Sequence, residues 1–189
     1  ALHGILSDVT YPSVAGTAVA RDFVELPSQL YEHWLTVPSV LSEHARHVET
    51  GEPIPSVLLD KVLSAQKFNA GFNAIEFTAS ALVDMAFHTA EEVPEDVIAF
   101  EKAKLEELGM PDAIAMRHRT PHFAHVFSGD GYSAGYYSYM WSEVLDADAF
   151  SAFEETGDVF SAEMAKKLHD HVYSAGGAID PEETYLAFR

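Results

Sequence analysis

Apolar side chains recur at helical spacing along most of the chain, and proline and glycine separate the stretches in which they do so. The clearest stretch is 69–89, whose apolar positions share one helical stripe: Phe72, Ile75, Ala79, Leu82, Val83 and Ala86. Such a stripe is typical of a helix that lies against a core, so we expect this helix to be central. The other predicted helices lie at about 22–35, 39–47, 56–68, 94–109, 132–153, 161–174 and from 181 onward.

Residues 116–127 depart from the helical pattern. They alternate imperfectly between apolar and polar positions and include Pro121, so we expect extended or irregular structure there. The chain has no internal repeat, no low-complexity stretch and no linker long enough to divide it. The sequence therefore predicts a mainly all-α protein with at most short extended segments, in which residues 1–189 form a single helical domain.

Charge and composition exclude several classes of partner. The 30 acidic and 11 basic side chains give a formal net charge of −19, whereas binding to nucleic acid or an anionic membrane depends on clustered Lys and Arg. We therefore expect no nucleic acid and no membrane among the partners. The chain has no cysteine, which excludes disulfides and thiolate metal sites and is compatible with a reducing compartment. We expect a cytoplasmic protein.

Three short stretches near the start carry candidate metal chemistry. They are residues 1–4 (Ala-Leu-His-Gly), residues 16–17 (Gly-Thr) and residues 21–29 (Arg-Asp-Phe-Val-Glu-Leu-Pro-Ser-Gln). Glu25 follows Asp22, the expected N-cap of a helix, and a carboxylate oxygen is a good zinc ligand. A Glu in a first helical turn is more often a partner of the helix dipole, so these residues alone leave both roles open.

A second group of candidate residues follows a stretch rich in His and Gly at 122–131. Tyr132, Tyr136 and Tyr139 are spaced i, i+4, i+7, so a helix would carry their hydroxyls on one side. A protonated phenol can donate a hydrogen bond to an oxyanion that forms during attack on an amide. Aromatic residues at this spacing are also typical of a core, and both interpretations stay open at this point.

Together the two groups resemble the thimet oligopeptidase and peptidyl-dipeptidase family of zinc metallopeptidases. In that family a His-Glu-Phe-Gly-His motif precedes Ala-Leu-His-Gly, and a ligand glutamate follows within Phe-Val-Glu-x-Pro-Ser-Gln. The resemblance implies that Glu25 is a zinc ligand. It also implies that His125, Tyr132 and Tyr136 contact substrate and that Tyr139 stabilises the oxyanion.

The resemblance covers essentially the whole chain and implies the helical part of a zincin-like catalytic domain. It implies zinc as cofactor and short peptides as substrates, with endopeptidase and dipeptide-releasing activity both left open. Because the His-Glu-x-x-His motif would precede Ala1, we expect an inactive fragment that binds no zinc at Glu25. We also expect frayed residues at 1–10 and an apolar surface uncovered near Phe23 and Leu26, through which the chain could self-associate.

Two alternatives remain beside this interpretation. The chain could be a non-catalytic helical protein that retains only the substrate-contacting half, or a helical binding or interaction module whose tyrosine face is simply packing. Arg117 and Arg119 either hold the free carboxylate of a peptide or form ion pairs with the abundant acids. Two histidine pairs, His44 with His47 and His169 with His171, are expected to be surface or packing residues because they lack further ligands at a recognised spacing.

Overall fold

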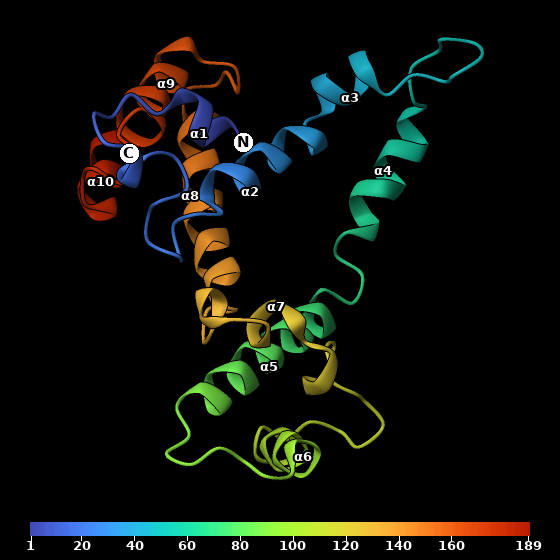
Figure 1. Ribbon diagram of the computed structural model, residues 1–189. Helices are drawn as coiled ribbons and strands as arrows, with labels where there is room; N and C mark the ends of the chain where they lie inside the picture. Colours follow the sequence, from blue (N-terminus) through green and yellow to red (C-terminus); the bar gives the residue numbers. More distant parts are fainter. The chain divides into compact units, whose positions relative to one another are not determined.

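The computed structural model describes residues 1–189, and helices joined by loops make up its regular secondary structure (Figure 1). It has no β-strand, and its one isolated bridge pairs Arg46 with Pro53. The α-helices are α1 (Leu2–Leu6), α2 (Leu26–Glu32), α3 (Pro38–His44), α4 (Ser56–Ala65), α5 (Ala70–His88), α6 (Val97–Glu107), α7 (Ala124–Phe127), α8 (Ser138–Glu155), α9 (Ala162–Lys167) and α10 (Pro181–Phe188). The all-α prediction is confirmed. None of the helices is both long and apolar enough to cross a membrane.

Short 3-10 and π-helices join several of these elements. The 3-10 helices are η1 (Pro12–Val14), η2 (His33–Thr36), η3 (Thr120–His122) and η4 (Asp130–Tyr132), and η5 (Leu168–Tyr173) is a π-helix. The chain divides into two compact units. The first unit joins Ala1–Ile54 to Ser138–Arg189, and the second is Pro55–Tyr137. That residues 1–189 form a single domain stays a prediction.

The core of the first unit lies where α2 packs along α8 (Figure 1). Leu26 and Leu30 lie one turn apart on α2 and are fully buried, so each contributes about 1.5–3 kcal/mol of apolar burial. The Trp34 ring packs edge-on against Phe150 and Phe153 of α8, and its indole N–H donates to the carbonyl of Val159 at 3.0 Å. The same core takes in η5 and α10.

The second unit is organised by the C-terminal half of α5. Phe87 of α5 packs against Phe100 of α6, with ring centroids 4.4 Å apart. The buried side chains of α5 are not the predicted apolar stripe. Ala79 and Val83 are buried as expected, but Phe72 and Ile75 are exposed, and the polar Asp84 is buried in their place. Leu82 is exposed as well, so the stripe prediction is wrong at three of its six positions. Asp84 is buried because its carboxylate accepts backbone amides from a later segment.

That later segment changes the start of the long helix. The sequence predicted a helix from 132, but α8 begins at Ser138, and Ala134 has a left-handed φ of 53°. The backbone amides of Ala134 and Tyr136 donate to the two carboxylate oxygens of Asp84 at 3.1 and 2.9 Å. These amides are therefore not used in helical bonds, so Tyr132, Tyr136 and Tyr139 do not share one helix face.

Two predictions about local structure near the start of the chain are also wrong. Asp22 is not the N-cap of α2, because the helix begins at Leu26 and residues 21–25 form turns before it. The expected exposure of Phe23 and Leu26 is wrong, because both are buried. Trp141 and Leu186 are exposed and line a pocket with Phe23, so the expected self-association stays a prediction. The residues 116–127 are only partly irregular, since they contain η3 and α7.

The first residues of the chain are tied to the first unit. The Ser7 hydroxyl donates to the His3 carbonyl at 2.7 Å and accepts from the Gly16 amide at 2.7 Å. Gly16 has a φ of 55°, and a Cβ there would lie 2.6 Å from the Cα of Gly4, so a side chain at this position would collide with α1. The backbone amide of Asp8 also donates to the carbonyl of Ser174. These bonds hold Ser7 and Asp8 against the rest of the first unit, and the expected fraying of residues 1–10 stays a prediction.

Candidate functional site

Glu25 occupies the position just before the first residue of α2. Its Oε2 accepts a hydrogen bond from the Ser28 hydroxyl at 2.6 Å. The side chain is half-buried and lines a hollow of about 450 Å³, whose other walls include residues 1–3, Thr17 and Tyr31. Ser28 therefore orients one oxygen of the carboxylate, and Oε1 is available to a cation.

His3 lies in the wall of the same hollow and is buried. Its ring meets the edge of the Tyr173 ring at a centroid distance of 5.7 Å and an interplanar angle of 84°. Burial lowers the pKa of His3, because a charged imidazolium loses hydration there. A neutral packing ring at this position agrees with the resemblance, in which this histidine is not a metal ligand.

Tyr139 lies in the first turn of α8, in the same unit as Glu25, and is half-buried. Two polar contacts hold the start of α8 against the segment that carries Glu25. The Gln29 side-chain amide donates to the Tyr139 carbonyl at 3.1 Å, and the Ser142 hydroxyl donates to the Asp22 carbonyl at 2.8 Å. The structure thus brings the beginnings of α2 and α8 together.

A pair that the sequence analysis missed, the half-buried His33 and the buried Asp146, continues this contact. His33 Nε2 lies 2.5 Å from Oδ1 of Asp146, and the His33 ring stacks on Phe150 at 4.7 Å. Burial raises the pKa of Asp146, and the hydrogen bond with His33 opposes that shift. The two residues are 113 positions apart, so no local spacing in the sequence could have paired them.

The second unit carries the other predicted substrate residues. The His125 ring lies 5.0 Å from the Tyr132 ring and 5.8 Å from the Tyr136 ring, measured between centroids. Tyr132 is half exposed at 51%, whereas Tyr136 is buried against Phe77, with ring centroids 4.6 Å apart. The structure therefore brings all three residues into one aromatic cluster.

The sequence analysis missed His118, which contacts the same cluster. Its Nε2 lies 3.3 Å from the Tyr136 hydroxyl, and its ring stacks on Phe123 at 4.7 Å. Burial, followed by the charge of Arg117, lowers the pKa of His118. Burial also raises the pKa of Tyr136, so its hydroxyl stays protonated at neutral pH. His118 lies just before the stretch rich in His and Gly at 122–131. This proximity is the one feature of the sequence that could have identified His118 as a member of the cluster.

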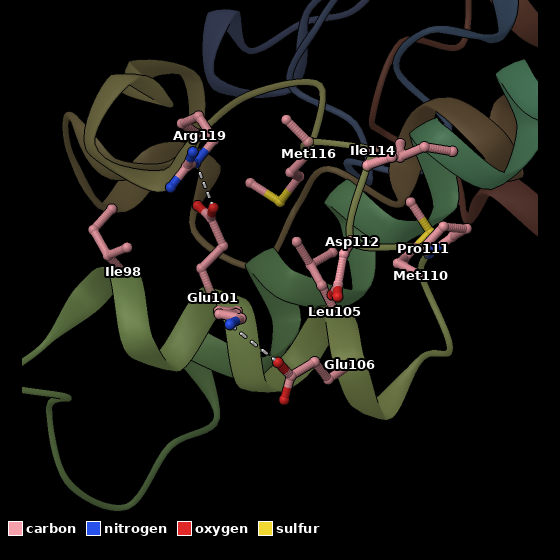
Figure 2. A pocket seen from close by; sticks show the side chains of 13 residues that line it. Ile98, Glu101, Leu105, Glu106, Met110, Pro111, Asp112, Ile114, Met116 and Arg119 are labelled. Carbon is pink, nitrogen blue, oxygen red and sulfur yellow. Dashed lines mark ion pairs between the residues drawn. The ribbon is translucent and has the colours of Figure 1, made fainter.

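Both arginines in this region form ion pairs. Arg119 Nε lies 2.6 Å from Oε1 of Glu101, a buried carboxylate on α6, and Figure 2 shows this ion pair in the lining of a pocket. The other carboxylate oxygen of Glu101 accepts from the Thr120 amide at 2.7 Å. Arg117 Nη1 lies 3.5 Å from Oε2 of Glu76. The ion-pair alternative for these arginines is therefore confirmed.

The candidate residues fall in two units. Glu25 and Tyr139 belong to the first, and His125, Tyr132 and Tyr136 belong to the second. Within residues 1–189 no group of three or more His, Asp or Glu side chains is placed to hold a metal ion. The individual roles of these five residues stay predictions.

The sequence of the chain is similar to those of known proteins. The sequence model of peptidase family M3 matches residues 1–189. The dipeptidyl carboxypeptidase of Salmonella typhimurium is 39% identical over 192 residues, an alignment that covers 100% of this chain and 28% of the relative. Oligopeptidase A of Escherichia coli is 38% identical over 191 residues, with the same two coverages.

A plant relative extends the comparison. The organellar oligopeptidase A of Arabidopsis thaliana, described as chloroplastic/mitochondrial, is 35% identical over 195 residues, which cover 100% of this chain and 24% of that protein. The chain thus spans 24–28% of the length of these curated relatives. The match extends over all the residues that carry the motifs, and the chain belongs to peptidase family M3, a family of zinc-dependent metallopeptidases.

Proposed function

We propose that this chain supplies one zinc ligand and the substrate-contacting side chains of a metallopeptidase that hydrolyses short peptides. The observation that carries the proposal is Glu25, which lies in a family-matched stretch, lines a hollow and has its carboxylate oriented by Ser28. Family membership along all 189 residues favours a peptidase over a non-catalytic interaction module. Relatives at 38–39% identity are described as a dipeptidyl carboxypeptidase and as an oligopeptidase. The proposal therefore names short peptides as substrates and does not choose between these two activities.

Glu25 fits the role of a single metal ligand. Catalytic zinc sites use three protein ligands and leave a further position open, and a carboxylate oxygen is a common member of the set. Zinc bound at such a site activates water and polarises the carbonyl of the scissile peptide. Ser28 would hold the Glu25 carboxylate in one orientation, which lowers the entropy lost when it binds a metal.

Tyr139 would act on the substrate oxygen. A phenol hydroxyl donates a hydrogen bond that strengthens as negative charge develops on the carbonyl oxygen during attack. Its backbone lies in the first turn of α8, which packs along α2 in the same unit as Glu25. A single donor of this kind contributes about 2.7–4 kcal/mol to transition-state stabilisation.

His125, Tyr132 and Tyr136 would contact the peptide. The cluster has two exposed members, His125 and Tyr132, which can meet a ligand, and one buried member, Tyr136, which anchors the others. The raised pKa of Tyr136 keeps its hydroxyl a donor at neutral pH. We also propose a cytoplasmic location, which the lack of cysteine supports and which a relative described as a probable cytosolic oligopeptidase A shares.

By themselves the 189 residues are proposed to be inactive. They contain no His-Glu-x-x-His sequence, and Glu25 offers one ligand where a stable zinc site needs three or four. Calorimetric titration of the chain with zinc should show no site that Glu25→Ala removes. A sub-micromolar site lost on that substitution would contradict this part of the proposal.

The test of the function uses the full-length enzyme, by which we mean a polypeptide that joins this chain to a His-Glu-x-x-His segment. Glu25→Ala should remove bound zinc, measured by metal analysis, and with it the hydrolysis of short peptides. Glu43→Ala, which removes an exposed carboxylate on α3, is the matched control and should change neither. Full zinc occupancy in a folded Glu25→Ala enzyme would refute the ligand assignment.

A further inference from the structure

Gln29 makes a hydrogen bond to the main chain of each of the two residues proposed to act at the reaction centre. Its backbone amide donates to the Glu25 carbonyl at 2.9 Å. Its side-chain amide Nε2 donates to the Tyr139 carbonyl at 3.1 Å. The proposed metal ligand and the proposed oxyanion donor are therefore joined through one intervening residue, although they lie 114 positions apart in the sequence (139 − 25).

Two further polar contacts flank Gln29 along the same seam. Ser142 bonds the Asp22 carbonyl at 2.8 Å, and Asp146 pairs with His33 at 2.5 Å. On α8 these partners and Tyr139 occupy positions i, i+3 and i+7, which lie on one face of a helix. Sliding α2 along α8 would break all three contacts at once, so the register of the two helices is well specified.

Gln29 is the member of this seam that bonds the first turn of α8. At the start of a helix the first four backbone N–H groups have no intrahelical acceptor, so the first turn of α8 is held less firmly than its centre. A donor fixed on α2 restrains that turn, and Leu26 and Leu30, both fully buried, hold α2 itself in place. The side chain of Gln29 thus acts where the position of Tyr139 is least secured by the rest of α8.

We infer that Gln29 is a positioning residue, whose side-chain amide fixes the Tyr139 end of α8 relative to Glu25. The inference rests on the proposed function for its catalytic meaning. A reacting group displaced by about 1 Å loses on the order of a hundredfold in rate, so one hydrogen bond at this point has a large effect on turnover. Both bonds from Gln29 end on backbone carbonyls, those of Glu25 and Tyr139.

The structural half of the inference can be tested on the 189-residue chain without any activity. Gln66 is the other glutamine and is exposed, so it provides an internal reference. Hydrogen exchange followed by NMR should show the Gln29 side-chain amide protons exchanging more slowly than those of Gln66. Equal exchange at the two glutamines would overturn the inference, and this comparison needs no substitution that could prevent folding.

Two variants of the same chain sharpen this test. Gln29→Met removes the donor and keeps the length of the side chain, so backbone amides in the first turns of α8 should lose several-fold of their protection. Trp34→Phe is the control, because it removes a different buried donor in the same unit, the bond to Val159, without contacting Glu25 or Tyr139. Unchanged protection in Gln29→Met, or an equal loss in both variants, would overturn the inference.

The catalytic half is tested in the full-length enzyme. Gln29→Met should lower kcat on the order of tenfold with KM nearly unchanged, and in a Tyr139→Phe background the same substitution should have little further effect. An additive loss in the double variant would mean that Gln29 does not act through Tyr139. A folded, zinc-loaded wild-type enzyme without peptidase activity would refute the proposed function and the positioning role with it, while the exchange result would still stand for the contact.

Discussion

Asp84 is the side chain on which the arrangement of the second unit depends most directly. It is 1% exposed, and its two carboxylate oxygens accept the backbone amides of Ala134 and Tyr136. Its Oδ1 also lies 2.8 Å from His88 Nδ1, one turn further along α5. We predict that Asp84→Asn destabilises the second unit and loosens residues 130–137, which carry Tyr132 and Tyr136.

The size of the effect follows from these contacts. Asparagine keeps one acceptor oxygen and replaces the other with an NH2 group, so one of the two backbone amides is left facing a donor. Losing a hydrogen bond to a charged group and leaving its partner buried costs about 2–3 kcal/mol. Amide exchange that depends on opening of this unit should then accelerate roughly 30- to 140-fold.

The assay is hydrogen exchange at the amides of Ala134 and Tyr136, with urea unfolding followed by far-UV circular dichroism. Tryptophan fluorescence is unsuitable here, because Trp34 and Trp141 both belong to the first unit. Asp96→Asn is the matched control: it makes the same chemical change at the cap of α6, where Asp96 accepts the Ala99 amide and asparagine caps equally well. Equal, small effects of the two substitutions would refute the role assigned to Asp84.

Three further predictions concern other positions. In the full-length enzyme Tyr139→Phe should lower kcat about a hundredfold or more with KM nearly unchanged. Wild-type turnover in steady-state kinetics would show that Tyr139 has only a packing role. Gly177→Ala should destabilise the first unit by more than about 1 kcal/mol, the lower limit for overpacking, because its Cβ would lie 2.0 Å from the Ala18 carbonyl oxygen. A Cβ at Gly71 on α5 would meet nothing within 4 Å, so Gly71→Ala should stabilise the protein by about 0.5–1 kcal/mol. Urea unfolding measures both changes. Burial lowers the pKa of His3 below its ordinary value of 6.5, so the unfolded chain binds more protons than the folded chain just below that pH. The free energy of unfolding should therefore rise as the pH rises through this range. Urea unfolding at pH 5 and pH 7.5 measures the increase, and His3→Gln should abolish this contribution to it.

The sequence by itself determined the helical class and the positions of most helices. The period of apolar residues and the punctuation by proline and glycine predicted a helix at 69–89, and α5 runs from Ala70 to His88. The residues around Glu25 also identified the family, because a motif is a property of consecutive residues. These features are local, so their physical causes, helical propensity and short-range spacing, can be read along the chain.

The tertiary structure decided what depends on partners distant in sequence. The break before α8 arises because Asp84 takes two amides from residues about 50 positions later, which helical spacing cannot reveal. The burial of Phe23 and Leu26, the His33–Asp146 pair and the bond from Gln29 to Tyr139 have the same origin. A buried carboxylate or amide stabilises whichever backbone group it meets, and only the packing of helices determines which group that is.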